Sequence, residues 1–249
     1  PNKLNEYPRI DISTSDFKDF RLRSDILVDK SLLIKEIIKA TTILLITRPR
    51  QTDAWGKPLS QNESINRTLF VGGEIDSDLE GPKDLYALKI SSDQKLMEKQ
   101  GKYPVIFFSL KNTKGNNYQE IENNVIKKVQ SAYKSHAYLV NSDQLDSFDK
   151  QVFQNHYRGE INKSDLQDSL RLLSELLVKH FHKKVFLLVD EYDETINHAY
   201  TKFGYESEEF TQVLDLVKEI LSSVLKDSTY LEKSVLTGIL KIAKSNLFS

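Results

Sequence analysis

Cysteine is absent from the 249 residues of this chain. Without thiols the protein has no disulfide framework, no thiolate zinc site and no cysteine nucleophile, and its composition fits a reducing compartment. No apolar run approaches the roughly 18 residues that a membrane-spanning helix needs, and the polar start at residues 1–6 does not resemble a signal peptide. These absences predict a soluble, cytoplasmic protein with no membrane partner.

An excess of charge of either sign is also missing. The 35 Lys and Arg residues nearly balance the 36 Asp and Glu residues, which leaves a formal net charge of −1. Nothing in this balance favours direct binding of nucleic acid, an anionic membrane or an acidic ligand. The five histidines lack the spacing of a zinc site, because His180 and His182 merely alternate before a strand candidate and no His-Glu-x-x-His motif occurs. Partners must therefore be inferred from local motifs.

The apolar run Val185–Val189, which ends in Asp190 and Glu191, is the stretch around which the chain is organised. A short run of β-branched, aliphatic and aromatic residues bounded by charge is typical of a strand buried on both faces of a parallel sheet. Three further runs have the same character, at residues 41–47, 104–110 and 234–238. Helical patterns separate these candidates, so the sequence predicts an α/β fold with a parallel sheet flanked by helices.

Periodic apolar residues predict the helices. Residues 30–40, 121–132 and 208–226 each carry an apolar stripe with helical spacing. A further helix is expected to begin at Ser164, where Gln167, three residues on, would complete a capping box. The apolar stripe of this helix consists of Leu166, Leu170, Leu173 and Leu177.

Three stretches lack this periodicity. Residues 51–82 are predicted to be a long connection with weak helical content, residues 137–163 are polar and mixed, and residues 195–207 are predicted to be an aromatic, polar loop. A compact domain rarely contains so long a connection as the first unless the segment is functional, mobile or degenerate.

Two carboxylates directly follow the central strand candidate. At the carboxyl end of a parallel strand, Asp190 and Glu191 would lie in the crevice where open α/β sheets bind ligands. In a P-loop nucleotidase, the first acid at this position organises Mg²⁺ and the next polarises the water that attacks the terminal phosphate. The alternative interpretation is an acidic turn that only closes a core strand.

A phosphate-binding loop is expected after the first strand candidate, because such loops combine backbone N–H groups with a Lys and a hydroxyl residue. Residues 47–58 contain Gly56 and Lys57 in roughly the right place. Pro58 stands where the hydroxyl residue belongs and has no backbone N–H, and the opening Gly is missing. Lys57 is therefore either a phosphate ligand or a solvated loop lysine.

Several segments together resemble one family, the AAA-ATPase-like domain of bacterial proteins that often carry a restriction-endonuclease-like nuclease domain. The segments are similar to the family's lead-in, first strand with Arg-Pro-Arg, second strand, acidic strand and sensor strand. They are Ile12–Phe17 with Val28–Lys30, Leu44–Arg50, Tyr103–Lys111, Val189–Asp193 and Leu236–Lys244. The resemblance spans residues 8–249, and the joint pattern is far more specific than any one motif.

The resemblance implies a P-loop NTPase-like, three-layer fold that uses ATP and Mg²⁺. Asp190 would bind the metal, Glu191 would orient the attacking water, and Thr237 would be the polar sensor between the acidic strand and the phosphate-loop strand. The alternative for these three residues is preserved scaffolding, with the Thr237 hydroxyl satisfied by backbone. The residues that would meet the phosphates are Gly56, Lys57, Arg48 and Arg50. For the two arginines, the alternative is exposure to solvent or pairing with an acid such as Asp193.

The resemblance also implies a domain organisation. Residues 1–29 would be a lead-in packed on the domain, and residues 30–249 would be the P-loop domain, truncated after the sensor strand so that its C-terminal strand and lid are absent. Because the chain begins with Pro1 instead of Met, we expect further parts of the protein to lie outside it. The expected partners are another protein or a C-terminal nuclease domain.

Two functions are predicted, because the phosphate loop departs from the family pattern. Five residues, and not two, separate Arg50 from Gly56, and Lys241 stands where an Arg is usual. The first function is a nucleotide-binding module with a degenerate phosphate loop that binds and hydrolyses Mg-ATP. The second is a catalytically inactive pseudo-ATPase that serves as a protein-interaction scaffold. A third idea, action on nucleic acid through an absent domain, has no support in the neutral charge.

Overall fold

The computed structural model describes residues 17–40, 43–46, 63–75, 81–226 and 229–238. The chain forms two compact units, one from residues 1–40 and 50–103 and the other from residues 41–49 and 104–249. This grouping follows contacts within the chain, whereas the division at residues 29 and 30 follows motifs and stays a prediction. Of the described helices, none is both long enough and apolar enough to cross a membrane.

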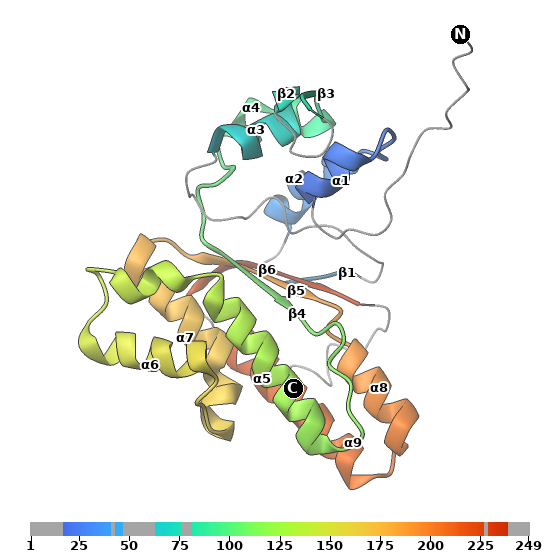
Figure 1. Cartoon of the computed structure of the whole chain (residues 1–249), viewed down its shortest axis with the longest axis vertical. Helices are drawn as coiled ribbons and strands as arrows, with labels where there is room; N and C mark the ends of the chain where they lie inside the picture. Colours follow the sequence, from blue (N-terminus) through green and yellow to red (C-terminus); the bar gives the residue numbers. More distant parts are fainter. Residues whose placement is uncertain (1–16, 41–42, 47–62, 76–80, 227–228, 239–249) are drawn as a thin grey trace. The chain divides into compact units, whose positions relative to one another are not determined.

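The larger unit is built on a parallel sheet (Figure 1). Its strands lie in the order β1-β6-β5-β4, and every neighbouring pair is parallel. The strands are β1 (Ile43–Ile46), β4 (Val105–Ser109), β5 (Val185–Asp190) and β6 (Leu231–Thr237). All four overlap the predicted strands, although β6 begins three residues earlier than predicted, and the α/β class with a helix-flanked parallel sheet, as in a P-loop NTPase-like fold, is confirmed.

Strand β5 is central because its residues are apolar on both sides. Val185, Leu187 and Val189 are at most 1% exposed and belong to the main core, and Phe186 and Leu188, which point to the opposite face, are also buried. A strand buried on both faces is typical of the interior of a parallel sheet, and β5 is paired with β6 on one edge and with β4 on the other. The run that ends in acid therefore lies inside the sheet.

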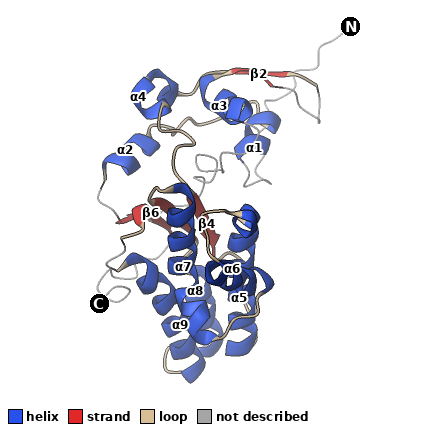
Figure 2. Ribbon diagram, turned by 90° about the vertical axis from the view of Figure 1, so that its left-hand side faces the viewer, coloured by secondary structure: helices blue, strands red, loops and turns tan. Residues whose placement is uncertain are grey.

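Helices cover one face of this sheet, and both views show them together on that side (Figures 1 and 2). Their core residues and those of the strands form a single apolar cluster. The helices are α5 (Tyr118–Lys134), α6 (Ser147–Arg158), α7 (Lys163–Phe181), α8 (Glu194–Phe203) and α9 (Glu208–Leu225), with the 3-10 turn η3 (Ala137–Asn141). Helices α5, α7 and α9 match the predicted patterns.

Helix α7 begins earlier than predicted. Asn162 caps it, and the capping box pairs Asn162 with Asp165 and does not involve Ser164 and Gln167. Asparagine and aspartate satisfy the same two backbone N–H groups as a Ser/Gln box, so the pattern was correct in kind and wrong in position. The predicted leucine stripe is confirmed, since all four leucines are at most 1% exposed.

Helices α6 and α8 lie in stretches for which the sequence predicted no helix. The prediction of a loop over residues 195–207 is wrong, because Glu194–Phe203 is helical. In α8 the buried side chains include a threonine and an alanine, and in α6 the fully buried apolar residue is Phe153, so few large apolar residues mark either helix in the sequence. Their ends carry the local signals: Asp146 caps α6 and left-handed Gly159 ends it.

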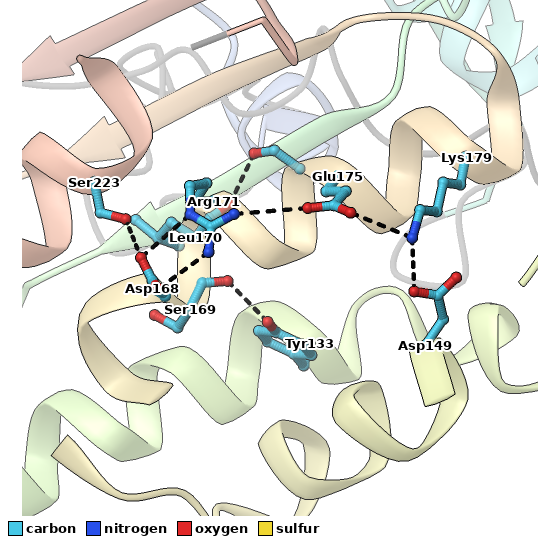
Figure 3. Close-up of polar contacts among 10 residues, drawn as sticks. Tyr133, Asp149, Asp168, Ser169, Leu170, Arg171, Glu175, Lys179 and Ser223 are labelled. Atoms are coloured by element: carbon cyan, nitrogen blue, oxygen red, sulfur yellow. Dashed lines mark hydrogen bonds and ion pairs between the residues drawn. The ribbon is translucent and has the colours of Figure 1, made fainter. Parts of the chain in front are cut away.

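Charged side chains on α7 tie it to two neighbouring helices (Figure 3). Asp168 accepts a hydrogen bond from Ser223 of α9, and Lys179 pairs with Asp149 of α6 at 2.7 Å. Glu175 lies on α7 between Asp168 and Lys179, and its Oε1 is 3.2 Å from Lys179 Nζ. Because partly exposed ion pairs contribute little stability each, most of the stability of this helix packing comes from the apolar core that the helices share.

The smaller unit has its own core of short elements around an antiparallel hairpin. Its elements are α1 (Phe17–Arg23), α2 (Leu33–Lys39), α3 (Glu63–Val71), β2 (Gly73–Ile75), β3 (Lys83–Leu85), η2 (Lys89–Ser92) and α4 (Gln94–Met97). Buried Arg21 donates to Tyr86 O at 2.6 Å and its guanidinium lies 4.6 Å from that ring. The described part of the predicted connection 51–82 thus contains α3 and β2, which confirms its weak helical content and adds a strand.

Candidate functional site

The carboxyl ends of the parallel strands bring Asp190 and Thr237 together. Thr237 ends β6, which lies between β5 and β1, and its hydroxyl donates to Asp190 Oδ1 at 2.6 Å. Ile46, the last residue of β1, is the register partner of Thr237. The predicted neighbourhood of acidic strand, sensor strand and first strand is therefore present, and a carboxylate and a hydroxyl converge at its edge.

Glu191 lies at a sharp turn directly after β5. Its φ of 51° is in the left-handed region, which a residue with a side chain rarely adopts outside turns and functional sites. The next residue, Tyr192, donates its backbone N–H to Thr237 O at 3.1 Å. The chain thus leaves the sheet at Glu191 while staying tied to β6, and Glu191 lies next to the Asp190–Thr237 contact.

A second carboxylate, Glu194 in the first turn of α8, shares a hydrogen bond with Glu191. This bond, with burial and the negative charges of Glu194 and Asp190, raises the pKa of Glu191 from its ordinary 4.5 to about 7. Burial alone would raise the pKa of Glu194, but hydrogen bonds from Glu191 and Asn112 and the charge of Lys114 lower it. The proton of the pair therefore resides mainly on Glu191.

This pKa predicts a pH dependence of stability. A carboxyl whose pKa is raised by folding stabilises the native state fully below its unfolded pKa of 4.5, and this contribution is lost as pH rises through about 7. The amide in Glu191→Gln keeps a donor at every pH. We expect the difference in free energy of unfolding, Glu191→Gln minus wild type, to increase by about 1 kcal/mol from pH of about 5 to about 8. This value is reduced for solvent screening. Urea denaturation across this range measures it.

The control for this pH series is Glu160→Gln, which neutralises an exposed glutamate between α6 and α7. Its difference from wild type should stay constant over the same range. A constant difference for Glu191→Gln as well would contradict the shared hydrogen bond.

The loop that follows β4 lies against the same edge, and sequence reasoning missed its contribution. Ser109 is the register partner of Asp190, and the Leu110 N–H donates to Asp190 O at 3.0 Å. Farther along, Asn112 N donates to Glu194 Oε1 at 3.0 Å. The start of this loop lies in the segment Tyr103–Lys111, which resembles the family's second strand. No residue type in that segment indicated more than an ordinary strand end.

Four predicted site residues, Arg48, Arg50, Gly56 and Lys57, lie outside the residues that the structure describes. Their roles toward phosphate, and the alternative pairing of the arginines with Asp193, stay predictions. Within the described residues, the site consists of the Asp190–Thr237 contact, the Glu191–Glu194 pair and the loop after β4.

The described residues fit a magnesium ion of the kind used with nucleotides. They contain no cluster of three or more His, Cys, Asp or Glu side chains that could hold a metal alone. Mg²⁺ at phosphoryl-transfer sites takes one or two carboxylates and fills its remaining positions with water and substrate phosphates. Asp190, whose carboxylate lies at the end of β5 beside the Thr237 hydroxyl, is the residue that would supply an oxygen ligand in this mode.

Comparison with known proteins found one family. The model of the AAA-ATPase_like family, described as "Predicted AAA-ATPase", matches residues 11–248. Neither the comparison with curated proteins nor the comparison with solved structures found a match. The matched range covers most of both compact units and every residue of the candidate site.

Proposed function

Because the chain belongs to the AAA-ATPase-like family, we propose that it binds ATP with Mg²⁺ at the carboxyl edge of its sheet and hydrolyses it. The observation that carries this proposal is the 2.6 Å contact between Thr237 and Asp190 on adjacent parallel strands, with Glu191 next in the chain. The Thr237 hydroxyl lies beside the carboxylate of Asp190, which precedes Glu191, and such groups suit phosphoryl transfer. Enzymes catalyse this reaction mainly by positioning the reactants and stabilising charge.

Each residue has a distinct role in the proposed reaction. Asp190 supplies the carboxylate oxygen that faces the metal. Thr237 fixes the rotamer of Asp190 through its hydrogen bond and contacts the terminal phosphate. Glu191 accepts the proton of the attacking water, and a base with a pKa of about 7 suits this transfer near neutral pH. A Mg²⁺ ion held by Asp190 would supply positive charge to the terminal phosphates.

A second function, the pseudo-ATPase scaffold, is favoured by one observation in the structure and one in the sequence. Glu191 is hydrogen-bonded to Glu194, so a proton occupies the carboxyl that should act as base over part of the neutral range. Pro58 replaces the hydroxyl residue of the phosphate loop. In this case the fold would retain nucleotide-like geometry without turnover, and a protein partner would be its ligand.

Calorimetric titration with ATP and ADP in the presence of Mg²⁺ tests the proposal. We expect saturable binding by the wild-type chain, and about tenfold weaker binding by Lys57→Ala, because a charged hydrogen bond to phosphate contributes on the order of 1.5 kcal/mol. The control is Lys127→Ala, an exposed lysine of α5. No binding at millimolar nucleotide rejects nucleotide function, whereas binding without hydrolysis leaves the scaffold function.

A further inference from the structure

The residues on either side of Lys111 each donate a backbone N–H to a hydrogen bond. The residue before it, Leu110, donates to Asp190 O at 3.0 Å, and the residue after it, Asn112, donates to Glu194 Oε1 at 3.0 Å. The two acceptors, Asp190 and Glu194, precede and follow Glu191 in the chain. The two hydrogen bonds therefore hold the backbone of Lys111 beside the turn at Glu191. The position of this lysine is therefore set by the sheet and by α8, and only its side chain is free to adjust.

The loop around Lys111 is held by further buried contacts. Thr113 and Thr195 are both fully buried, and their hydroxyls contact each other. Thr113 also donates to Leu110 O, and His198 of α8 contacts the backbone of Gly115. These contacts join the loop to the first two turns of α8, so Lys111 does not depend on an exposed, self-supporting loop for its placement.

Two carboxylates near Lys111 already have other partners. Glu194 already accepts the Asn112 N–H and lies 3.6 Å from the Lys114 ammonium, and Asp190 is engaged by Thr237. The hydrogen bonds donated by the residues on either side of Lys111 place it beside Glu191. This is the part of the edge where the attacking water and terminal phosphate would lie.

We propose that Lys111 is a second cationic ligand for the terminal phosphates of the bound nucleotide. The inference rests on the proposed nucleotide function and adds a residue to it. Lysine is a common phosphate ligand because its ammonium is a compact point charge on a flexible stem. A cation supplied by the strand next to the acidic strand would compensate for a phosphate loop in which Pro58 replaces the hydroxyl residue.

The test compares affinities for a non-hydrolysable ATP analogue and for ADP, both with Mg²⁺, by calorimetry. Lys111→Ala is expected to weaken binding of the ATP analogue about tenfold and of ADP about threefold or less, because the contact is to the terminal phosphate. Lys111→Arg should restore the ATP-analogue affinity to within about threefold of wild type. Lys127→Ala removes the same charge from exposed α5 and should change neither affinity.

The ratio of the two affinities makes the outcomes distinguishable, because a fraction of unfolded protein leaves it unchanged. If wild type binds nucleotide and Lys111→Ala has the wild-type ratio, the role of Lys111 is rejected and the nucleotide function stands. A lower melting temperature with an unchanged ratio has the same meaning, since it identifies Lys111 as a partner of the carboxylates only. If wild type binds neither nucleotide, the proposed function and this inference both fail.

Discussion

Glu191→Gln is expected to lower ATP turnover about 100-fold or more, since general base catalysis contributes roughly 10² to 10⁴ in rate. Glutamine has nearly the same shape and still donates to Glu194, so the acidic turn should keep its geometry. It cannot accept the proton of the attacking water. Affinity for Mg-ATP should therefore stay within about threefold of wild type, and the loss should appear in kcat and not in KM. Steady-state turnover combined with calorimetric binding measures both quantities.

The matched control for this substitution is Glu160→Gln, which makes the same chemical change at an exposed position far from β5 in the sequence. It should leave turnover unchanged. Turnover of Glu191→Gln within about threefold of wild type would show that Glu191 is not the base. A parallel loss of binding would instead assign Glu191 a role in holding the nucleotide.

The strands could be predicted because their signal is local. A strand buried on both faces is a run of apolar residues, and Val185–Val189 shows this pattern without reference to any other part of the chain. The consequence for the site is direct, because parallel strands end at one edge, and the residues at their ends must converge there. The order of the strands is not a local signal, and it was the family resemblance that put Thr237 between the acidic strand and the phosphate-loop strand; the Asp190–Thr237 hydrogen bond agrees with that order.

Glu194 and Lys111 could not be predicted in the same way, because their placement depends on contacts across long sequence separations. The Asn112–Glu194 hydrogen bond joins residues 82 positions apart. The first turn of α8 looked like a polar loop, since its buried positions include Thr195 and its N-terminal residue Asp193 makes no side-chain cap. Without that helix, Glu194 had no predicted location, and the carboxylate pair with Glu191 could not be inferred.

Packing at the end of the sensor strand is as demanding as the chemistry beside it. Gly238 follows Thr237 and is buried, and a Cβ at this position would lie 2.5 Å from Tyr192 Cε1 and 2.6 Å from Asp193 Oδ1. Both distances are far below normal contact, and Tyr192 is fully buried, so its ring cannot swing into solvent. A glycine is needed here because the backbone approaches the acidic turn closely, and not because of a positive φ.

Gly238→Ala is therefore expected to lower the free energy of unfolding by about 2 kcal/mol, in the range for inserting a methyl group into a filled core. Urea denaturation measures the loss, and a double-mutant cycle identifies its source. Tyr192→Leu removes the ring that the new methyl group would meet, so the double variant should be more stable than the sum of the single losses by at least about 0.5 kcal/mol. Strict additivity would place the strain elsewhere. Because the backbone N–H of Tyr192 donates to Thr237 O, a shift of the Tyr192 backbone should also move Thr237, and Gly238→Ala should weaken nucleotide binding in the fraction that remains folded.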